Sequence, residues 1–201
     1  MKLYGTTTSP FVRRVRVVAA EVAEPVELIN TAPDEGQAEL RRISPIRKVP
    51  VAVVDATVAG GLTLFDSRVI IEWLTTTHGW ADLTPTRGRW HEQNIINAID
   101  AALDAVIQLF YLRRDGVAVD GSPYAERQLA RADAIFAWLG TKLVDGRSFS
   151  GGFGLPELAL ISALDWMDFR KTYETSTIGA VEAVREAWRD RPSLASTMPH
   201  A

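Results

Sequence analysis

The most informative segment of the chain runs from residue 48 to residue 74 and reads KVPVAVVDATVAGGLTLFDSRVIIEWL. It contains two short runs of strand type, residues 49–54 and residues 62–65, and Gly60-Gly61 between them predicts a turn. We therefore predict a β-hairpin. Asp66-Ser67 directly follows the second run and supplies N-cap chemistry for a helix.

The residues on either side of this segment change hydrophobic period repeatedly. Apolar residues at helical spacing after Ser9-Pro10, and again after Asp66-Ser67, indicate amphipathic helices. The expected elements are a strand at Lys2–Tyr4, a helix beginning at Pro10, a strand at Pro25–Ile29, a helix at Asp34–Arg42, the two strands of the hairpin and a helix ending near His78-Gly79. The predicted order is β-α-β-α-β-β-α within the first 78 or so residues.

From residue 86 onward the strand signal disappears and only helical periodicity is left. Helices are expected around Ile99–Phe110, after Ser122-Pro123, at Leu155–Phe169 and at Ala180–Arg189, with Pro192 beginning a tail. The segment Leu155–Phe169 is apolar on nearly every side, which predicts a central buried helix. Trp80–Thr86 is the natural linker, so we predict a mixed α/β domain over residues 1–79 and an all-helical domain over residues 86–201.

Composition excludes several classes of function. With 47% hydrophobic and 23% charged residues, the chain can bury a sizeable core, and a formal charge of −3 argues against nucleic acid as the main partner. The chain has no cysteine, so any sulfur chemistry must use the sulfur of a ligand. The three histidines lie far apart, and no metal site is expected. No leader or membrane-spanning run is recognised, and a cytoplasmic protein is the default expectation.

Three short motifs of the first half fall near one end of the predicted sheet. Ser9-Pro10 begins a helix, where free N–H groups and the helix dipole favour an anion and a hydroxyl can donate to a thiolate. Lys48-Val49-Pro50 precedes a strand, where Val49 can pair its backbone with a peptide ligand, particularly if the proline is cis. Asp66-Ser67 can hold the ammonium and carboxylate of an amino acid. Each motif alone is also typical of an ordinary helix cap or strand start.

Taken together, MKLYGTTTSPFVRRVRVVAAE, SPIRKVPVAVVD and LFDSRVIIEWL resemble the amino-terminal half of cytosolic glutathione S-transferases, especially bacterial ones with a serine-type active site. ALDAVIQLFYLRR and LPELALISALDWMDFR resemble the first long helix and the central helix of the carboxy-terminal half. The resemblance implies a thioredoxin-like α/β domain followed by an all-α domain, with glutathione as co-substrate. It also implies a homodimer.

The resemblance assigns roles residue by residue. Ser9 matches the residue that contacts the glutathione sulfur, and Val49 and Pro50 match the backbone-pairing residue and the family's cis proline. Lys48 matches a residue that reaches the peptide or glycine end, while Asp66 and Ser67 match those that hold the γ-glutamyl group. The electrophile is expected between the domains, with walls from Phe11, Phe110, Tyr111 and Arg114.

Two departures from the family pattern affect the interpretation. Tyr4, Thr7 and Thr8 also carry hydroxyl groups near the predicted sulfur position, although the order of residues favours Ser9. Gly154 stands where the central helix normally has a hydroxyl N-cap, but the acid Glu157 is retained at the third helical position. The predicted function is a glutathione transferase acting on small hydrophobic electrophiles; a glutathione-dependent isomerase or dehalogenase, or a non-catalytic binding protein, is the alternative.

Overall fold

The computed structural model describes residues 1–54, 61–86 and 89–200, and the chain divides into two compact units. The first unit comprises Met1–Leu83 together with Asp190–Ala201, and the second comprises Thr84–Arg189. The boundary after Leu83 falls inside the predicted linker. The assignment of all residues from 86 to 201 to the helical domain needs correction, because the last residues of the chain pack with the first unit.

The first unit is built on a four-stranded mixed sheet in the order β2-β1-β3-β4. Its strands are β1 (Lys2–Gly5), β2 (Glu27–Asn30), β3 (Val51–Val54) and β4 (Leu62–Phe65). Strand β1 pairs in parallel with β2 and antiparallel with β3, and β3 pairs antiparallel with β4. The predicted hairpin is therefore confirmed, while Gly60 of its predicted turn lies outside the described residues.

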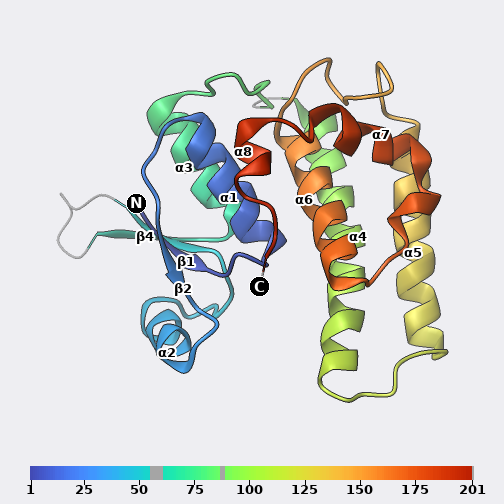
Figure 1. Ribbon diagram of the computed structural model, residues 1–201, viewed down its shortest axis with the longest axis horizontal. Coiled ribbons are helices and arrows are strands. Elements are labelled where there is room, and N and C mark those ends of the chain that lie inside the picture. The colour runs from blue at the N-terminus through green and yellow to red at the C-terminus, as the bar shows by residue number, and fades with distance from the viewer. Residues whose placement is uncertain (55–60, 87–88, 201) are drawn as a thin grey trace. The chain divides into compact units, whose positions relative to one another are not determined.

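Helices cover both faces of this sheet, as Figure 1 shows. They are α1 (Pro10–Glu21), α2 (Asp34–Ile43) and α3 (Ser67–His78). Helices α1 and α3 pack against each other on one face, and α2 lies on the other, where Leu40 packs with Tyr4 and Val51 of the sheet. Alternation of side chains along each strand explains this layering, because successive residues point to opposite faces. The unit has the thioredoxin-like α/β fold predicted from the sequence.

The second unit consists of helices, as predicted: α4 (Trp90–Arg114), α5 (Pro123–Gly140), α6 (Leu155–Arg170), the short 3₁₀ helix η1 (Thr175–Thr177) and α7 (Gly179–Trp188). Helix α4 packs against both α5 and α6, and α7 packs against α5 and α6. Residues 156–167 of α6 are all buried, which confirms the central helix predicted from its uniform apolar composition.

Helix α4 requires one correction to the sequence analysis. It is long and apolar enough to cross a membrane by length and composition alone, although no such run was recognised in the sequence. In this unit its Ile99, Leu103, Val106 and Leu109 are buried, and the helix packs against two neighbours, which is the arrangement of a core helix.

The start of α6 is held by the carboxylate of Glu157. Its Oε2 accepts a hydrogen bond from the Gly154 N–H at 2.9 Å, and its Oε1 accepts one from the Phe149 N–H at 2.6 Å. Because glycine has no side chain, only this carboxylate half of a capping box is formed. Burial raises the pKa of Glu157, and hydrogen bonds from the backbone oppose that shift. The acid retained at the third helical position therefore fixes both the helix and the loop before it.

The last residues of the chain form a short helix, α8 (Pro192–Ala195), which packs on α1. The buried Arg13 of α1 donates hydrogen bonds to the Leu194 carbonyl at 3.2 Å and to Thr197 Oγ1 at 3.4 Å. The burial of Arg13 therefore reflects the tail that covers it.

Candidate glutathione site

The sheet register brings the three predicted motifs to one end of the sheet. Tyr4 of β1 pairs with Val51 of β3, and Val51 pairs with Phe65 of β4, so these residues form one row across the sheet. The chain leaves this row toward Ser9 after β1 and toward Asp66 after β4, and Pro50 immediately precedes Val51, the first residue of β3. Antiparallel pairing of β3 with both neighbours is what places the start of one strand beside the ends of two others.

Ser9 is the N-cap residue of α1, and its side chain is half-buried. Its Oγ accepts a hydrogen bond from the Val12 N–H at 3.3 Å, so the hydroxyl does cap the helix. No described residue accepts a hydrogen bond from its O–H, which leaves that proton free to be donated elsewhere. Pro10 carries no N–H and the first-turn N–H of Phe11 has no described acceptor, as is usual at a helix start. A hydroxyl donor thus stands at the positive end of a helix dipole.

The competing hydroxyl groups are engaged with other partners. Thr7 Oγ1 donates to the His200 carbonyl at 2.7 Å, and Thr8 Oγ1 lies 3.1 Å from Thr6 Oγ1. Tyr4 points toward α2, where its hydroxyl donates to Glu39 Oε1 at 3.4 Å. Burial, followed by the charge of Glu39, raises the pKa of Tyr4 and makes it a poorer proton donor. Of these hydroxyl groups, that of Ser9 is therefore best suited to meet a thiolate.

The segment before β3 has the features predicted for it. The Val49–Pro50 peptide bond is cis, and Pro50 is buried while Val49 is half-buried. Lys48 is exposed, and within the described part of the chain no carboxylate pairs with it. An extended ligand backbone beside β3 would therefore meet an available ammonium group at this end of the sheet.

Asp66 and Ser67 form the start of α3. Asp66 is exposed, and its Oδ1 accepts a hydrogen bond from the Arg68 N–H at 2.9 Å. Ser67 is buried, with its hydroxyl bonded to none of the described residues. Asp66 has φ 73° and ψ 140°, a backbone conformation that non-glycine residues rarely adopt. Together the two residues offer an acceptor for an ammonium group and a donor for a carboxylate.

The predicted electrophile residues lie in two different units. Phe110, Tyr111 and Arg114 lie on α4, where the two aromatic rings are 5.4 Å apart and the Arg114 guanidinium lies 4.7 Å from the Tyr111 ring centre. Phe11 lies on α1 of the first unit, with the Arg14 guanidinium 5.0 Å from its ring centre. The three residues of α4 form one continuous surface. That Phe11 contributes to the same site stays a prediction.

Two groups of residues were missed by the sequence analysis. At the end of α6, Arg170 contacts the rings of Phe110 and Phe169, and this contact depends on how α6 packs on α4. The other group is the tail, since His200 reaches the loop before Ser9 across 193 positions of sequence. The sequence offered a signal for Arg170, because Phe169-Arg170 ends the most apolar helix of the chain. It offered no signal for the contact of His200 with the loop before Ser9.

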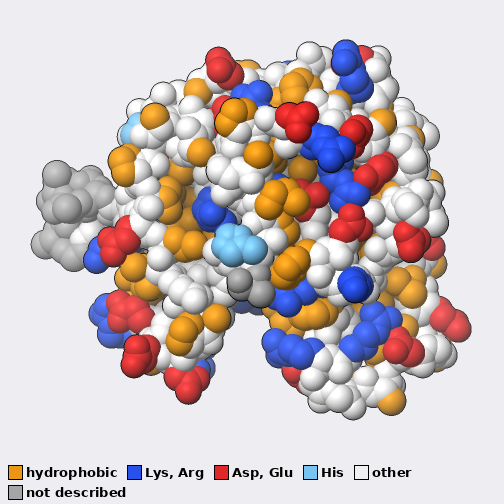
Figure 2. Space-filling view, in the orientation of Figure 1, with side chains coloured by type: hydrophobic (Ala, Val, Ile, Leu, Met, Phe, Trp, Pro, Cys, Tyr) orange, Lys and Arg blue, Asp and Glu red, His pale blue; other side chains and the backbone are white. Residues whose placement is uncertain are grey.

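Metal ligands do not gather in the described residues, where no group of three His, Asp or Glu side chains is placed to hold an ion. On the face shown in Figure 2, basic and acidic side chains are interspersed and are not separated by sign. The chemistry offered by the first unit is therefore that of hydroxyl, ammonium, carboxylate and backbone groups.

Comparison with known proteins identifies a family that matches the first part of the chain. Residues 3–85 match the family described as the glutathione S-transferase N-terminal domain. The chain is 26% identical over 205 residues to an uncharacterised glutathione S-transferase-like protein, YibF, of Escherichia coli K12, a match that covers 99% of this chain and 98% of YibF.

Solved structures extend the similarity to the whole chain. A glutathione S-transferase of Methylobacillus flagellatus with glutathione bound has a TM-score of 0.84 and 25% identity, covering 99% of each chain. One of Methylobacterium radiotolerans in complex with glutathione sulfonate has a TM-score of 0.84 and 24% identity, covering 100% of this chain and 95% of that one. The chain has the glutathione S-transferase fold, and the family match covers the greater part of its first unit.

Proposed function

We propose that this protein is a glutathione transferase that holds the glutathione sulfur as a thiolate beside Ser9 and directs it to an electrophilic carbon. The observation that carries the proposal is the Ser9 hydroxyl, which stands at the start of α1 with no described acceptor for its proton. The neighbouring hydroxyl groups of Thr7 and Tyr4 donate to other partners. Related proteins crystallised with glutathione or glutathione sulfonate support the choice of ligand.

The proposed role of Ser9 is to stabilise the charged form of the sulfur. A free thiol has a pKa of about 8.5, so most of it is protonated at neutral pH and is a weak nucleophile. A hydrogen bond from the Ser9 O–H, together with the free Phe11 N–H at the start of α1, favours the thiolate and lowers that pKa. Each unit of lowering needs about 1.4 kcal/mol, which one charge-assisted hydrogen bond and a helix end can supply.

The other motif residues would hold the tripeptide in place. The backbone of Val49 pairs with the cysteinyl unit in the manner of an added strand, and Lys48 reaches the glycine end. Asp66 accepts from the γ-glutamyl ammonium while Ser67, at the first turn of α3, donates to the γ-glutamyl carboxylate. Fixing both ends of the ligand positions its sulfur, which raises the rate of attack through proximity.

The proposed reaction forms a thioether. The sulfur attacks an electrophilic carbon, the leaving group departs with the bonding electron pair, and the thiol proton passes to solvent. Phe110, Tyr111 and Arg114 on α4 are proposed to contact the electrophile, together with Phe11 from the first unit.

The proposal is tested by titrating the purified protein with glutathione in a calorimeter and by following conjugation of 1-chloro-2,4-dinitrobenzene. Saturable binding with turnover above the rate without protein is the expected result. Binding without turnover on this or other alkyl and aryl halides would favour the non-catalytic alternative. Failure to bind glutathione at millimolar concentration would overturn the proposal.

We also propose that the protein is a homodimer, as the family resemblance implies. Large apolar side chains that are exposed in the chain by itself, among them Leu62 and Val69 in the first unit, support this proposal. Sedimentation equilibrium should give twice the mass of one chain, and a monomer at micromolar concentration would contradict it.

A further inference from the structure

The carboxy-terminal ends of α4 and α6 carry a connected group of rings and guanidinium groups, which we call the arginine–aromatic cluster. Its members are Phe110, Tyr111, Arg114, Trp166, Phe169 and Arg170. The Phe110 ring is central, with ring centres of Tyr111 and Trp166 at 5.4 Å and 5.5 Å. The Arg170 guanidinium lies 5.3 Å from the Phe110 ring centre and 5.0 Å from that of Phe169. With Arg114 beside Tyr111, two cations flank one continuous aromatic surface.

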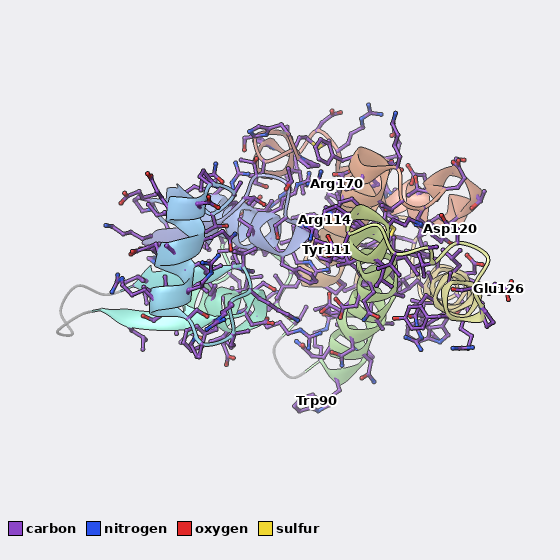
Figure 3. The ribbon with its side chains drawn as sticks, turned by 90° about the horizontal axis from the view of Figure 1, so that it is seen from below. Trp90, Tyr111, Arg114, Asp120, Glu126 and Arg170 are labelled. Atoms are coloured by element: carbon purple, nitrogen blue, oxygen red, sulfur yellow. The ribbon has the colours of Figure 1, made fainter. Side chains whose placement is uncertain are left out.

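Figure 3 shows Tyr111, Arg114 and Arg170 close together in its view of the helical unit. The chain of printed ring contacts from Arg170 through Phe110 and Tyr111 to Arg114 agrees with that view. Tyr111 is 47% exposed and the Arg114 side chain is 58% exposed, so the cluster is accessible from solvent on that side.

Arg170 differs from the other arginines at this part of the unit in its lack of an acidic partner. Arg113 pairs with Asp120 at 2.6 Å, Arg114 pairs with Asp115 at 2.8 Å, and Arg185 pairs with Asp165 at 3.3 Å and with Asp168. The two acids in the last turns of the helix that carries Arg170 are therefore engaged by another arginine. Within residues 1–54, 61–86 and 89–200, no group accepts a hydrogen bond from Arg170, and its Nε is buried without a partner.

The geometry of this group suits a flat anion. The Arg170 guanidinium carbon lies over the rings of Phe110 and Phe169, and its two Nη groups have no described acceptor, so they stay available for a carboxylate. A guanidinium meets a carboxylate through paired, charge-assisted hydrogen bonds. An aromatic ring attached to that carboxylate can pack on Phe110 and Tyr111. The guanidinium and the aromatic rings of the cluster therefore both favour an aromatic carboxylate.

We propose that the arginine–aromatic cluster binds electrophiles that carry a carboxylate on an aromatic ring, with Arg170 binding the carboxylate and Phe110 and Tyr111 contacting the ring. This inference rests on the proposed transferase function and adds to it a substrate class and a specificity-determining residue, Arg170. In the reaction, the glutathione sulfur forms a C–S bond at the activated ring carbon, the C–halogen bond breaks, and halide leaves with the electron pair while the thiol proton goes to solvent.

The test compares two electrophiles that differ in charge, 4-chloro-3-nitrobenzoate and its methyl ester. Arg170→Met keeps an unbranched side chain of similar length for the ring contacts, and should lower kcat/KM for the benzoate roughly tenfold or more, mainly through KM. It should change the ester less than about twofold, because the ester offers no charge to the guanidinium. Arg170→Lys should restore part of the loss. Arg147→Met, in the loop before α6, removes one exposed arginine outside the cluster and serves as the matched control.

Equal losses on both electrophiles, or an unchanged preference for the benzoate in Arg170→Met, would overturn the inference. Binding of 4-chloro-3-nitrobenzoate without glutathione, measured by calorimetry, separates this inference from the proposed function. If conjugation is absent but the benzoate binds the wild type about tenfold more tightly than Arg170→Met, the anion site stands and the transferase activity fails. If conjugation occurs with no dependence on residue 170, the transferase stands and the anion site fails.

Discussion

The guanidinium of Arg191 donates two hydrogen bonds to the carboxylate of Glu21, from Nε to Oε1 at 2.7 Å and from Nη2 to Oε2 at 2.8 Å. The hydroxyl of Ser193 donates a third to the same carboxylate. Both members of the pair are largely buried, with side-chain exposures of 19% for Arg191 and 10% for Glu21. The pair joins the end of α1 to the last segment of the chain and is one of the contacts that hold that segment in the first unit.

We predict that Glu21→Gln destabilises the protein by about 2 kcal/mol, because an amide cannot accept both guanidinium hydrogen bonds and leaves buried donors unpaired. Burial raises the pKa of Glu21, but hydrogen bonds from Arg191 and Ser193 outweigh it and leave the pKa below its usual value of 4.5. The stabilisation is therefore present above about pH 4.5 and is lost as the pH falls through the lower pKa of the folded state. Urea unfolding at pH 7 and at pH 3 measures both effects.

Glu186→Gln is the matched control for this prediction. Glu186 pairs with Arg189 at 2.7 Å, but the side chains are 68% and 60% exposed, so the change should cost less than about 0.5 kcal/mol. A loss as small in Glu21→Gln would mean that the tail is not held by this pair. Amide exchange of residues 192–198 gives an independent measure of how firmly the tail is attached.

Much of the first unit could be predicted from the sequence, because its elements begin and end at residues with strong local preferences. The strand Leu62–Phe65 has the predicted limits, and α1 and α3 begin after Ser9 and Asp66 as expected. Capping chemistry and alternating apolar residues act over a few positions, so they can be recognised without knowing what packs nearby.

The remaining features depend on contacts between distant positions. The burial of Arg13 comes from contacts with Leu194 and Thr197, far along the chain, which no local pattern in α1 indicates. The contact of Arg170 with Phe110 depends on how α6 packs against α4, and the sequence of α6 alone does not indicate it. The order of residues already favours Ser9, but only the packed tail and α2 show that the hydroxyl groups of Thr7 and Tyr4 donate to other partners. Periodicity within one element cannot supply such information.

Ser9→Ala is predicted to have two separable effects. Loss of the N-cap should destabilise the protein by about 1 kcal/mol, and loss of the hydroxyl donor should raise the pKa of the bound glutathione thiol and lower kcat/KM at neutral pH. The thiolate absorbance of the glutathione complex, titrated against pH, measures the pKa directly. Steady-state kinetics and thermal unfolding complete the comparison.

Ser122→Ala provides the control, because Ser122 caps α5 in the same way, with Oγ accepting from the Ala125 N–H at 3.2 Å. It should lose a similar amount of stability without moving the thiol pKa or the rate. If Ser9→Ala behaves like Ser122→Ala in every measurement, Ser9 is only a helix cap and the sulfur is stabilised elsewhere.

Asp66→Gly should stabilise the folded protein and weaken glutathione binding. Glycine adopts a φ near 73° without strain, which should contribute about 1 kcal/mol, while replacing the N-cap side chain by glycine costs only a few tenths. Loss of the carboxylate removes the acceptor for the γ-glutamyl ammonium and should raise Kd roughly tenfold.

Asp66→Asn separates these two effects, because asparagine tolerates a positive φ and keeps an oxygen to cap Arg68 but carries no charge. It should leave stability nearly unchanged and weaken binding less than glycine does. Unchanged glutathione affinity in both variants would show that Asp66 does not bind the ammonium group.

Glu92 gives a prediction of pH-dependent stability in the second unit. Its carboxylate is fully buried at the start of α4, with Arg89 Nη2 at 2.6 Å and His91 Nε2 at 3.5 Å from Oε1. Burial raises the pKa of Glu92 despite these cations, and Glu92 in turn contributes to the raised pKa of the buried Glu157. A raised pKa means that the folded state binds protons more tightly than the unfolded state does. Stability should therefore fall as the pH rises from about 4.5, the usual value, through the raised pKa of the folded protein.

Glu92→Gln removes this titration while keeping an oxygen that can accept from Arg89, so its stability relative to the wild type should be more favourable at pH 8 than at pH 4. The slope should be reduced and not abolished, because Glu157 still titrates in the same direction. Urea unfolding midpoints measured every half unit between those limits test this, with Glu126→Gln at an exposed first-turn position of α5 as the control. If the difference in unfolding midpoint between Glu92→Gln and the wild type stays constant over that range, the pKa of Glu92 is the same in the folded and unfolded states. Arg89 and His91 would then fully compensate the burial of the carboxylate.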